Sequence, residues 1–139
     1  MPEVEWARLK AHELRALAQA DAVVILPVAA MEQHGPHLPV MTDTRIGGEV
    51  ARRTALRVSK ARPCVAAPVV WSGLSEHHMP FGGTLTLGPE TFAAVLRDLI
   101  GAMVRLGFRK ILISNSHGGN IIAINHAVET LAVDCPATL

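Results

Sequence analysis

Two segments of the chain concentrate side chains that can bind a divalent metal ion. The first covers residues 31–43 and contains Glu32, His34 and Asp43, and the second is the run N-S-H-G-G-N around His117. Imidazole nitrogens and carboxylate oxygens suit Zn²⁺, and also Mn²⁺ or Fe²⁺. A carboxylate between two cations can bridge them, as in two-metal sites with ions about 3.5–4 Å apart. We expect the two segments to be halves of one metal site.

An apolar run precedes each of these segments and predicts a buried strand. Residues 22–28 (A-V-V-I-L-P-V) are almost continuously apolar, as expected when helices cover both faces of a parallel sheet. The patterns predict the order α-β-α-β-α-β-α, with strands at 22–28, 64–70 and 110–114 and helices at 6–19, 43–58 and 89–106 and from residue 120. The fold class is therefore α/β with one domain over residues 1–139.

The loops that follow the three predicted strands hold most of the polar side chains of interest. Parallel strands joined by right-handed crossovers place these loops at the same edge of a sheet, where ligands gather. We therefore expect loops 29–43, 71–88 and 115–120 to meet there.

Several single residues have competing interpretations. Asp43 or Thr44 could cap the N-terminus of the following helix, a role worth about 1 kcal/mol that is compatible with metal binding. Pro68 removes one ladder donor, which indicates an edge strand or a strand end. For His12 and His126, both on predicted helices, we expect surface or hydrogen-bonding roles.

Glu32 and His34 form an E-x-H pair whose side chains point the same way if the loop is extended. His37 could bind a metal, but we expect it to orient the loop. The middle loop offers Ser75 and His78 as candidate catalytic residues, for substrate contact or proton transfer. No G-x-S-x-G, G-x-G-x-x-G or G-x-x-x-x-G-K-[ST] motif occurs, so a serine hydrolase or a nucleotide-binding protein has no motif behind it.

The composition excludes several partners. The net charge is +1 over 139 residues, and the basic side chains are scattered, which argues against nucleic acid and anionic membranes. No apolar run approaches the length of a membrane span, and the N-terminus lacks a signal-peptide pattern, so we expect a cytoplasmic protein. Cys64 and Cys135 lack metal-binding spacing, and we expect inert thiols in a reducing compartment.

The chain resembles the creatininase (creatinine amidohydrolase) family in three segments. These are E-Q-H-G-P-H-L-P at 32–39 with Thr42-Asp43, F-G-G-T at 81–84, and N-S-H-G-G-N at 115–120. The resemblance implies a three-layer α/β/α sandwich with a mostly parallel sheet and a dinuclear metal centre. It also implies homo-oligomers and hydrolysis of a non-peptide C–N bond, often in a cyclic amide. The implied metal ligands are Glu32, His34, Asp43 and His117, with Asp43 as the bridge and Zn²⁺ as the usual metal.

One position departs from the family pattern. Creatininase has a glutamate ligand where this chain has Gly119, and relatives with H-G-G-N take an acidic ligand from further along the chain. Glu129 and Asp134 are the acidic residues that remain after this point. Family members continue well beyond the length of this sequence, so we expect the C-terminal part of the fold to be missing.

The leading hypothesis is hydrolysis of a small-molecule amide by metal-activated water. His78 would protonate the leaving amine, and backbone N–H groups of Gly118 and Gly119 would stabilise the oxyanion. Two alternatives stay open: an inactive metal-binding or scaffolding remnant of the fold, and a relative that acts on a formamide or a peptide C-terminus.

Overall fold

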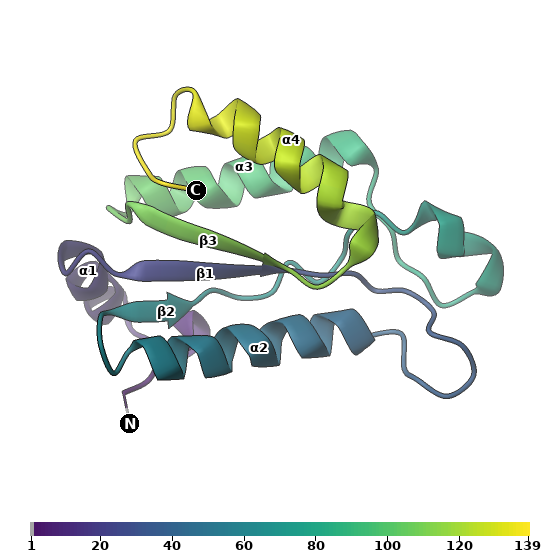
Figure 1. Ribbon diagram of the computed structural model, residues 1–139, viewed down its shortest axis with the longest axis horizontal. Helices are drawn as coiled ribbons and strands as arrows, with labels where there is room; N and C mark the ends of the chain where they lie inside the picture. Colours follow the sequence, from purple (N-terminus) through teal and green to yellow (C-terminus); the bar gives the residue numbers. More distant parts are fainter. Residues whose placement is uncertain (1) are drawn as a thin grey trace.

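A parallel three-stranded sheet forms the centre of the computed structural model, which describes residues 2–139 (Figure 1). The strand order is β2 (Cys64–Ala66), β1 (Val23–Val28) and β3 (Lys110–Asn115). β1 pairs with β3 along its whole length, from Val23 opposite Lys110 to Val28 opposite Asn115. The predicted α/β class with a parallel sheet is confirmed.

Helices cover both faces of this sheet. α2 (Thr42–Val58) packs on one face, and α3 (Pro89–Arg105) and α4 (Ile121–Ala132) pack on the other (Figure 1). α1 (Ala11–Gln19) lies at the end of the sheet where β1 begins (Figure 1). The layers are therefore α/β/α, as the resemblance implied.

The alternation of side chains along β1 explains its continuous apolar run. Val24 and Leu26 belong to a core cluster with Phe92 and Leu96 of α3, while Ile25 belongs to a separate cluster with small residues of α2. Each fully buried side chain of this size contributes about 1.5–3 kcal/mol from loss of apolar surface to water. Both faces of β1 thus need apolar residues, and no polar position is left for solvent.

The predicted helix at 6–19 is wrong in its first part. Residues Trp6–Arg8 form a 3₁₀ turn (η1), and the α-helix begins only at Ala11. The backbone of Lys10 is extended, and its N–H donates to the Glu13 carboxylate at 2.7 Å, which caps the new helix. Trp6 packs against Phe108, with 5.2 Å between ring centroids, and this contact holds the turn on the core.

The predicted strand at 64–70 is too long, since β2 ends at Ala66. The next residues still follow β1, because Ala67 N–H donates to the Ile25 carbonyl and Val70 N–H donates to the Pro27 carbonyl. Pro68 cannot donate a ladder hydrogen bond. The prediction that Pro68 marks an edge or a strand end is confirmed.

The predicted helix cap at Asp43 or Thr44 is also wrong. α2 begins at Thr42 with Met41 at the cap position, and no side chain caps it. Thr44 Oγ instead donates to the carbonyls of Ala30 and Trp71, which ties α2 to two loops. Asp43 lies in the first helical turn with its carboxylate free for another role.

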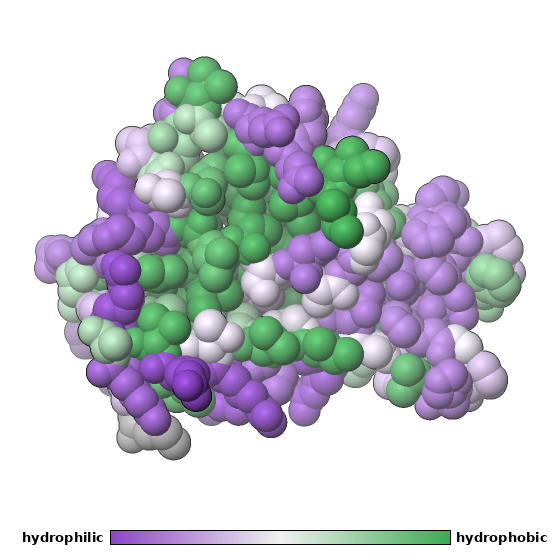
Figure 2. Space-filling view, viewed as in Figure 1, coloured by the Kyte–Doolittle hydropathy of each residue, from purple (hydrophilic) through white to green (hydrophobic). Residues whose placement is uncertain are grey.

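Within residues 2–139, no helix is both long and apolar enough to cross a bilayer. Both cysteines are free thiols, and burial raises the pKa of Cys64. Apolar side chains of β3 and α4 remain exposed, including Leu112, Ile121 and Ile122. Figure 2 shows this apolar region beside a hydrophilic end formed by the loops that follow the strands.

Candidate metal centre

Carboxylates and imidazoles meet beyond the carboxyl ends of β1 and β3. Glu32 and His34 come from the loop after β1, Asp43 from the first turn of α2, and His117 from the loop after β3. His78 joins them from a 3₁₀ turn, η2 (Glu76–Phe81), in the loop after β2. The three loops therefore meet at one edge, as parallel pairing requires.

The groups alternate between imidazole and carboxylate. Asp43 places Oδ1 3.3 Å from His34 Nε2 and Oδ2 3.2 Å from His117 Nδ1. Glu32 places Oε1 3.4 Å from His117 Nδ1 and Oε2 3.5 Å from His78 Nε2. Each carboxylate thus faces two different imidazoles.

His117 directs its Nδ1 toward both carboxylates. Its Nε2 donates to the Leu74 carbonyl at 3.0 Å, and Ser75 Oγ lies 3.3 Å from the same nitrogen. A carbonyl only accepts, so the hydrogen of the neutral ring lies on Nε2. Nδ1 is then an unprotonated nitrogen beside two carboxylate oxygens, a set of donors that a cation satisfies and that otherwise repel one another.

A buried atom without a hydrogen bond supports the same conclusion. Glu32 is 5% exposed, and its Oε2 has no hydrogen-bond partner among the described residues. A buried ionised oxygen without a partner costs several kcal/mol. Ligand atoms of Glu32, Asp43 and His117 lie within 4.8 Å of one another, and all three residues are buried. These donors fit a divalent cation.

Asn120 ties the three loops together, and its role was not evident from the sequence. Its side chain is fully buried: Nδ2 donates to the Ala29 carbonyl at 2.9 Å, and Oδ1 accepts from Leu74 N–H at 2.9 Å. A Cβ at Gly73 would lie 2.4 Å from Oδ1, so glycine permits this contact. Only the final position of the N-S-H-G-G-N run could have pointed to Asn120.

Position 119 has little room for a side chain. A Cβ on Gly119 would lie 2.4 Å from His117 Nε2 and 2.4 Å from the Leu74 carbonyl oxygen. No side chain fits there while His117 keeps its orientation. Glu129 and Asp134 are exposed, and neither belongs to a potential metal-binding group among residues 2–139.

The other histidines divide into two groups. His77 is exposed but stacks on His117 with 6.3 Å between ring centroids, and it can form a potential ligand group with Glu32 and His78. His77 was not among the site residues predicted from the sequence. His12, His37 and His126 are exposed and lie outside both potential ligand groups.

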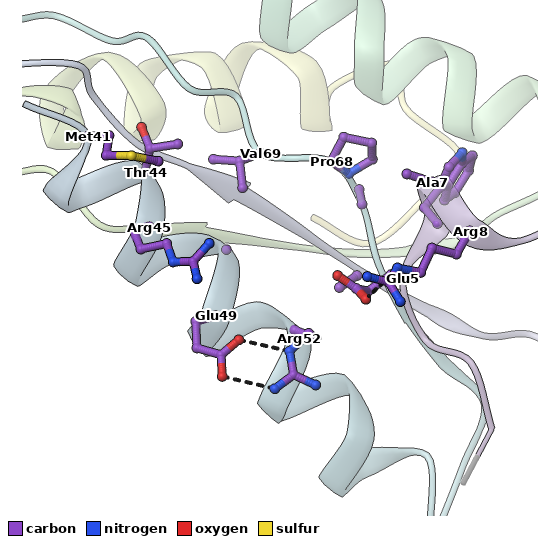
Figure 3. Close-up of a pocket in the computed structure, with 14 residues that line it drawn as sticks. Glu5, Ala7, Arg8, Met41, Thr44, Arg45, Glu49, Arg52, Pro68 and Val69 are labelled. Carbon is purple, nitrogen blue, oxygen red and sulfur yellow. Dashed lines mark hydrogen bonds and ion pairs between the residues drawn. The ribbon is translucent and has the colours of Figure 1, made fainter.

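A groove of about 550 Å³ lies between α2, the segment 66–69 at the end of β2 and the N-terminal residues 5–8 (Figure 3). Arg45, Glu49 and Arg52 line it, and Arg52 makes two hydrogen bonds to Glu49. None of the clustered imidazoles and carboxylates lines this groove. The candidate site is therefore the cluster and not this groove.

The sequence of this chain matches a known protein family and its members. A family model described as "Creatininase: Creatinine amidohydrolase" matches residues 7–139. The chain belongs to the creatininase family. It is 35% identical over 134 residues to the mycofactocin precursor peptide peptidase of Mycobacterium tuberculosis, a match that covers 88% of this chain and 53% of that protein.

Two further creatininase-family proteins give similar matches. The creatinine amidohydrolase of Pseudomonas putida is 29% identical over 132 residues, which cover 91% of this chain and 48% of that protein. The solved structure "Creatininase Mn" superposes with a TM-score of 0.82 at 28% identity, covering 95% of this chain and 54% of the other. The chain thus spans about half the length of the relatives it matches.

Proposed function

We propose that this chain carries the metal centre of a metal-dependent amidohydrolase that cleaves a C–N bond in a small-molecule or peptide amide. The observation that supports this most directly is the buried Glu32 carboxylate, whose Oε2 has no hydrogen-bond partner among residues 2–139 and lies 3.5 Å from His78 Nε2, and whose Oε1 faces His117 Nδ1. Membership of the creatininase family supports the class of reaction.

Glu32, Asp43 and His117 would hold one divalent ion, and His34 with the second oxygen of Asp43 would contribute to another. We propose Zn²⁺, with Mn²⁺ or Fe²⁺ as alternatives, because these metals accept mixed nitrogen and oxygen ligands. A bound divalent ion supplies Lewis acidity, which polarises an amide carbonyl and makes water a nucleophile at neutral pH.

The remaining residues orient groups and move protons. Ser75 is fully buried and contacts the His117 nitrogen that points away from the carboxylates, so we assign it to orienting that ring. His78 lies at the edge of the cluster and is half-buried, so it can give a proton to the leaving amine. We assign the backbone N–H of Gly118 to stabilising the oxyanion, since open space borders this residue, where a Cβ would meet nothing within 4 Å.

Location, assembly and substrate class complete the proposal. We propose a cytoplasmic homo-oligomer whose substrate is an amide and not a nucleic acid or a membrane. The absence of room for an acidic side chain at Gly119 favours a second candidate, in which the chain binds one ion without turnover. A substrate with a formamide or a C-terminal peptide bond fits the same metal centre.

Metal content and amide hydrolysis, measured for the wild type and for His34→Ala, test the proposal. We expect His34→Ala to lower both, because its Nε2 faces the Asp43 carboxylate at 3.3 Å. His126→Ala, at an exposed histidine of α4, is the matched control and should change neither. Equal metal content and rates in all three proteins would contradict the proposal, and metal binding without hydrolysis of any amide would favour the second candidate.

A further inference from the structure

We propose that Gln33 is a positioning residue that sets the tautomer of His78 and thereby makes its Nε2–H a hydrogen-bond donor toward the metal centre rather than a metal ligand. The consequence for the metal centre rests on the proposed function. The tautomer itself is a property of the chain that needs neither metal nor substrate.

The orientation of the Gln33 amide follows from its two contacts. Its Oε1 accepts a hydrogen bond from Gly35 N–H at 2.9 Å, and its Nε2 lies 2.6 Å from His78 Nδ1. If the amide were turned over, its NH₂ group would face the Gly35 N–H, and two donors would oppose each other. Gly35 therefore decides which end of the amide faces His78.

The tautomer of His78 follows from the amide. Nε2 of Gln33 has only hydrogens to offer, so His78 Nδ1 must accept, and the neutral ring carries its hydrogen on Nε2. That Nε2 lies 3.5 Å from Glu32 Oε2, the buried oxygen for which residues 2–139 provide no hydrogen bond. The N–H of His78 thus points at the metal centre.

The same tautomer argues against a second metal site at this edge. Glu32, His77 and His78 have the right atoms within reach of one another, but a ligand nitrogen must offer a lone pair. The nitrogen of His78 that faces Glu32 carries a hydrogen instead. A residue that resembles a metal ligand by position is therefore made a hydrogen-bond donor by its neighbour.

The backbone fixes the pair from both sides. Gln33 N–H donates to Thr84 Oγ at 3.2 Å, and Thr84 Oγ–H donates to the His78 carbonyl at 3.4 Å. Gly35 has a φ of +71°, a conformation that side chains disfavour and that turns the loop at this point. Gln33 and His78 are thus connected twice, by the contact between their side chains and by hydrogen bonds between their main chains and Thr84.

Long-range ¹H–¹⁵N correlation spectra of the metal-free protein report which ring nitrogen carries the hydrogen. Spectra are recorded at a pH of about 8, where imidazoles are neutral, and His78→Gln identifies the His78 signals. We expect a hydrogen on Nε2 and none on Nδ1 in the wild type. In Gln33→Glu, one carboxylate oxygen can still accept from Gly35 N–H, and the other can only accept from His78, so we expect a hydrogen on Nδ1.

Gln19→Glu is the matched control, because it makes the same change at an exposed residue of α1 and should leave the His78 signals unchanged. A hydrogen on Nδ1 in the wild type would overturn the proposal, even if Gln33→Glu failed to fold. An unchanged tautomer in a folded Gln33→Glu protein would overturn it as well. Because the spectra need no metal or substrate, they can support this inference even where the hydrolysis assay rejects the proposed function.

Discussion

Helix α2 carries two carboxylates in opposite situations. Glu49 is on the solvent side and accepts hydrogen bonds from two guanidinium groups, at 2.8 and 2.9 Å from Arg52 and at 2.6 Å from Arg53. Asp43, one helix turn and a half earlier, is buried, and its ion-pair partners among residues 2–139 are histidines alone. Glu49 has permanent cations beside it, whereas Asp43 has imidazoles that are cationic only when protonated. The difference indicates that the buried cluster is completed by a cation from outside the chain.

The largest expected effect is on metal binding and hydrolysis, and it comes from removing the charge of Asp43 but not that of Glu49. We expect Asp43→Asn to lose bound metal and to lower amide hydrolysis by roughly 100-fold or more, because a metal's Lewis acidity is worth several kcal/mol and about 1.4 kcal/mol is tenfold. Glu49→Gln should keep both properties. Metal analysis and initial rates give the answer, and a comparable loss in the two variants would erase the distinction between the two carboxylates.

The stabilisation of the fold by a bound cation compares Asp43 with Glu49 without any substrate. A cation that binds only the folded state at a concentration of 100 times its Kd stabilises that state by about 2.7 kcal/mol. We expect this increase in the free energy of unfolding for the wild type and for Glu49→Gln, and not for Asp43→Asn. Thermal melts with and without Zn²⁺ measure it. An equal increase in the free energy of unfolding of Asp43→Asn would mean that the cation binds at a site without Asp43.

The fit around His117 gives a smaller effect. A methyl group at Gly119 would press on the His117 ring and on the Leu74 carbonyl, so Gly119→Ala should lower the free energy of unfolding by about 1–3 kcal/mol. Gly118→Ala is the matched control, since its Cβ would meet nothing within 4 Å, and it should stay within about 0.5 kcal/mol of the wild type. Urea titrations measure the free energy of unfolding of both variants. Equal values for Gly119→Ala and Gly118→Ala would contradict the steric account.

The smallest effect concerns Glu49 and its dependence on pH. The hydrogen bonds from Arg52 and Arg53 lower the pKa of Glu49 from 4.5 to about 2. A carboxyl group with a lowered folded pKa stabilises the fold above its unfolded pKa, and this contribution is lost as the pH falls through about 2. Glu49→Gln should therefore differ slightly in stability from the wild type at neutral pH and approach it in acid. A stability difference between the wild type and Glu49→Gln that persists below that pH, or that added salt does not reduce, would contradict the ion-pair account.

The sequence was sufficient for the features that depend on periodicity and order. The apolar run at 22–28 predicted a strand covered on both faces, and the alternation of strands and helices predicted loops meeting at one edge. These inferences hold because parallel strands leave little freedom in where their loops lie. They brought Glu32, Asp43 and His117 into one hypothesis before any distance was known.

The features that were missed depend on contacts between distant residues. Nothing local distinguishes Asp43 as a free carboxylate from Asp43 as a helix cap, because the choice depends on where His117 lies. The break before Ala11 follows from a carboxylate cap and from the packing of Trp6 on Phe108. The buried role of Asn120 follows from its bonds to two other loops.

Anomalous diffraction at the zinc absorption edge, from crystals of the chain grown with Zn²⁺, tests the central claim most directly. The account predicts a peak about 2.0–2.2 Å from a nitrogen of His117 and from carboxylate oxygens of Glu32 and Asp43. A zinc-loaded crystal with no peak among these three side chains, or with its ion bound only by other residues, would contradict it.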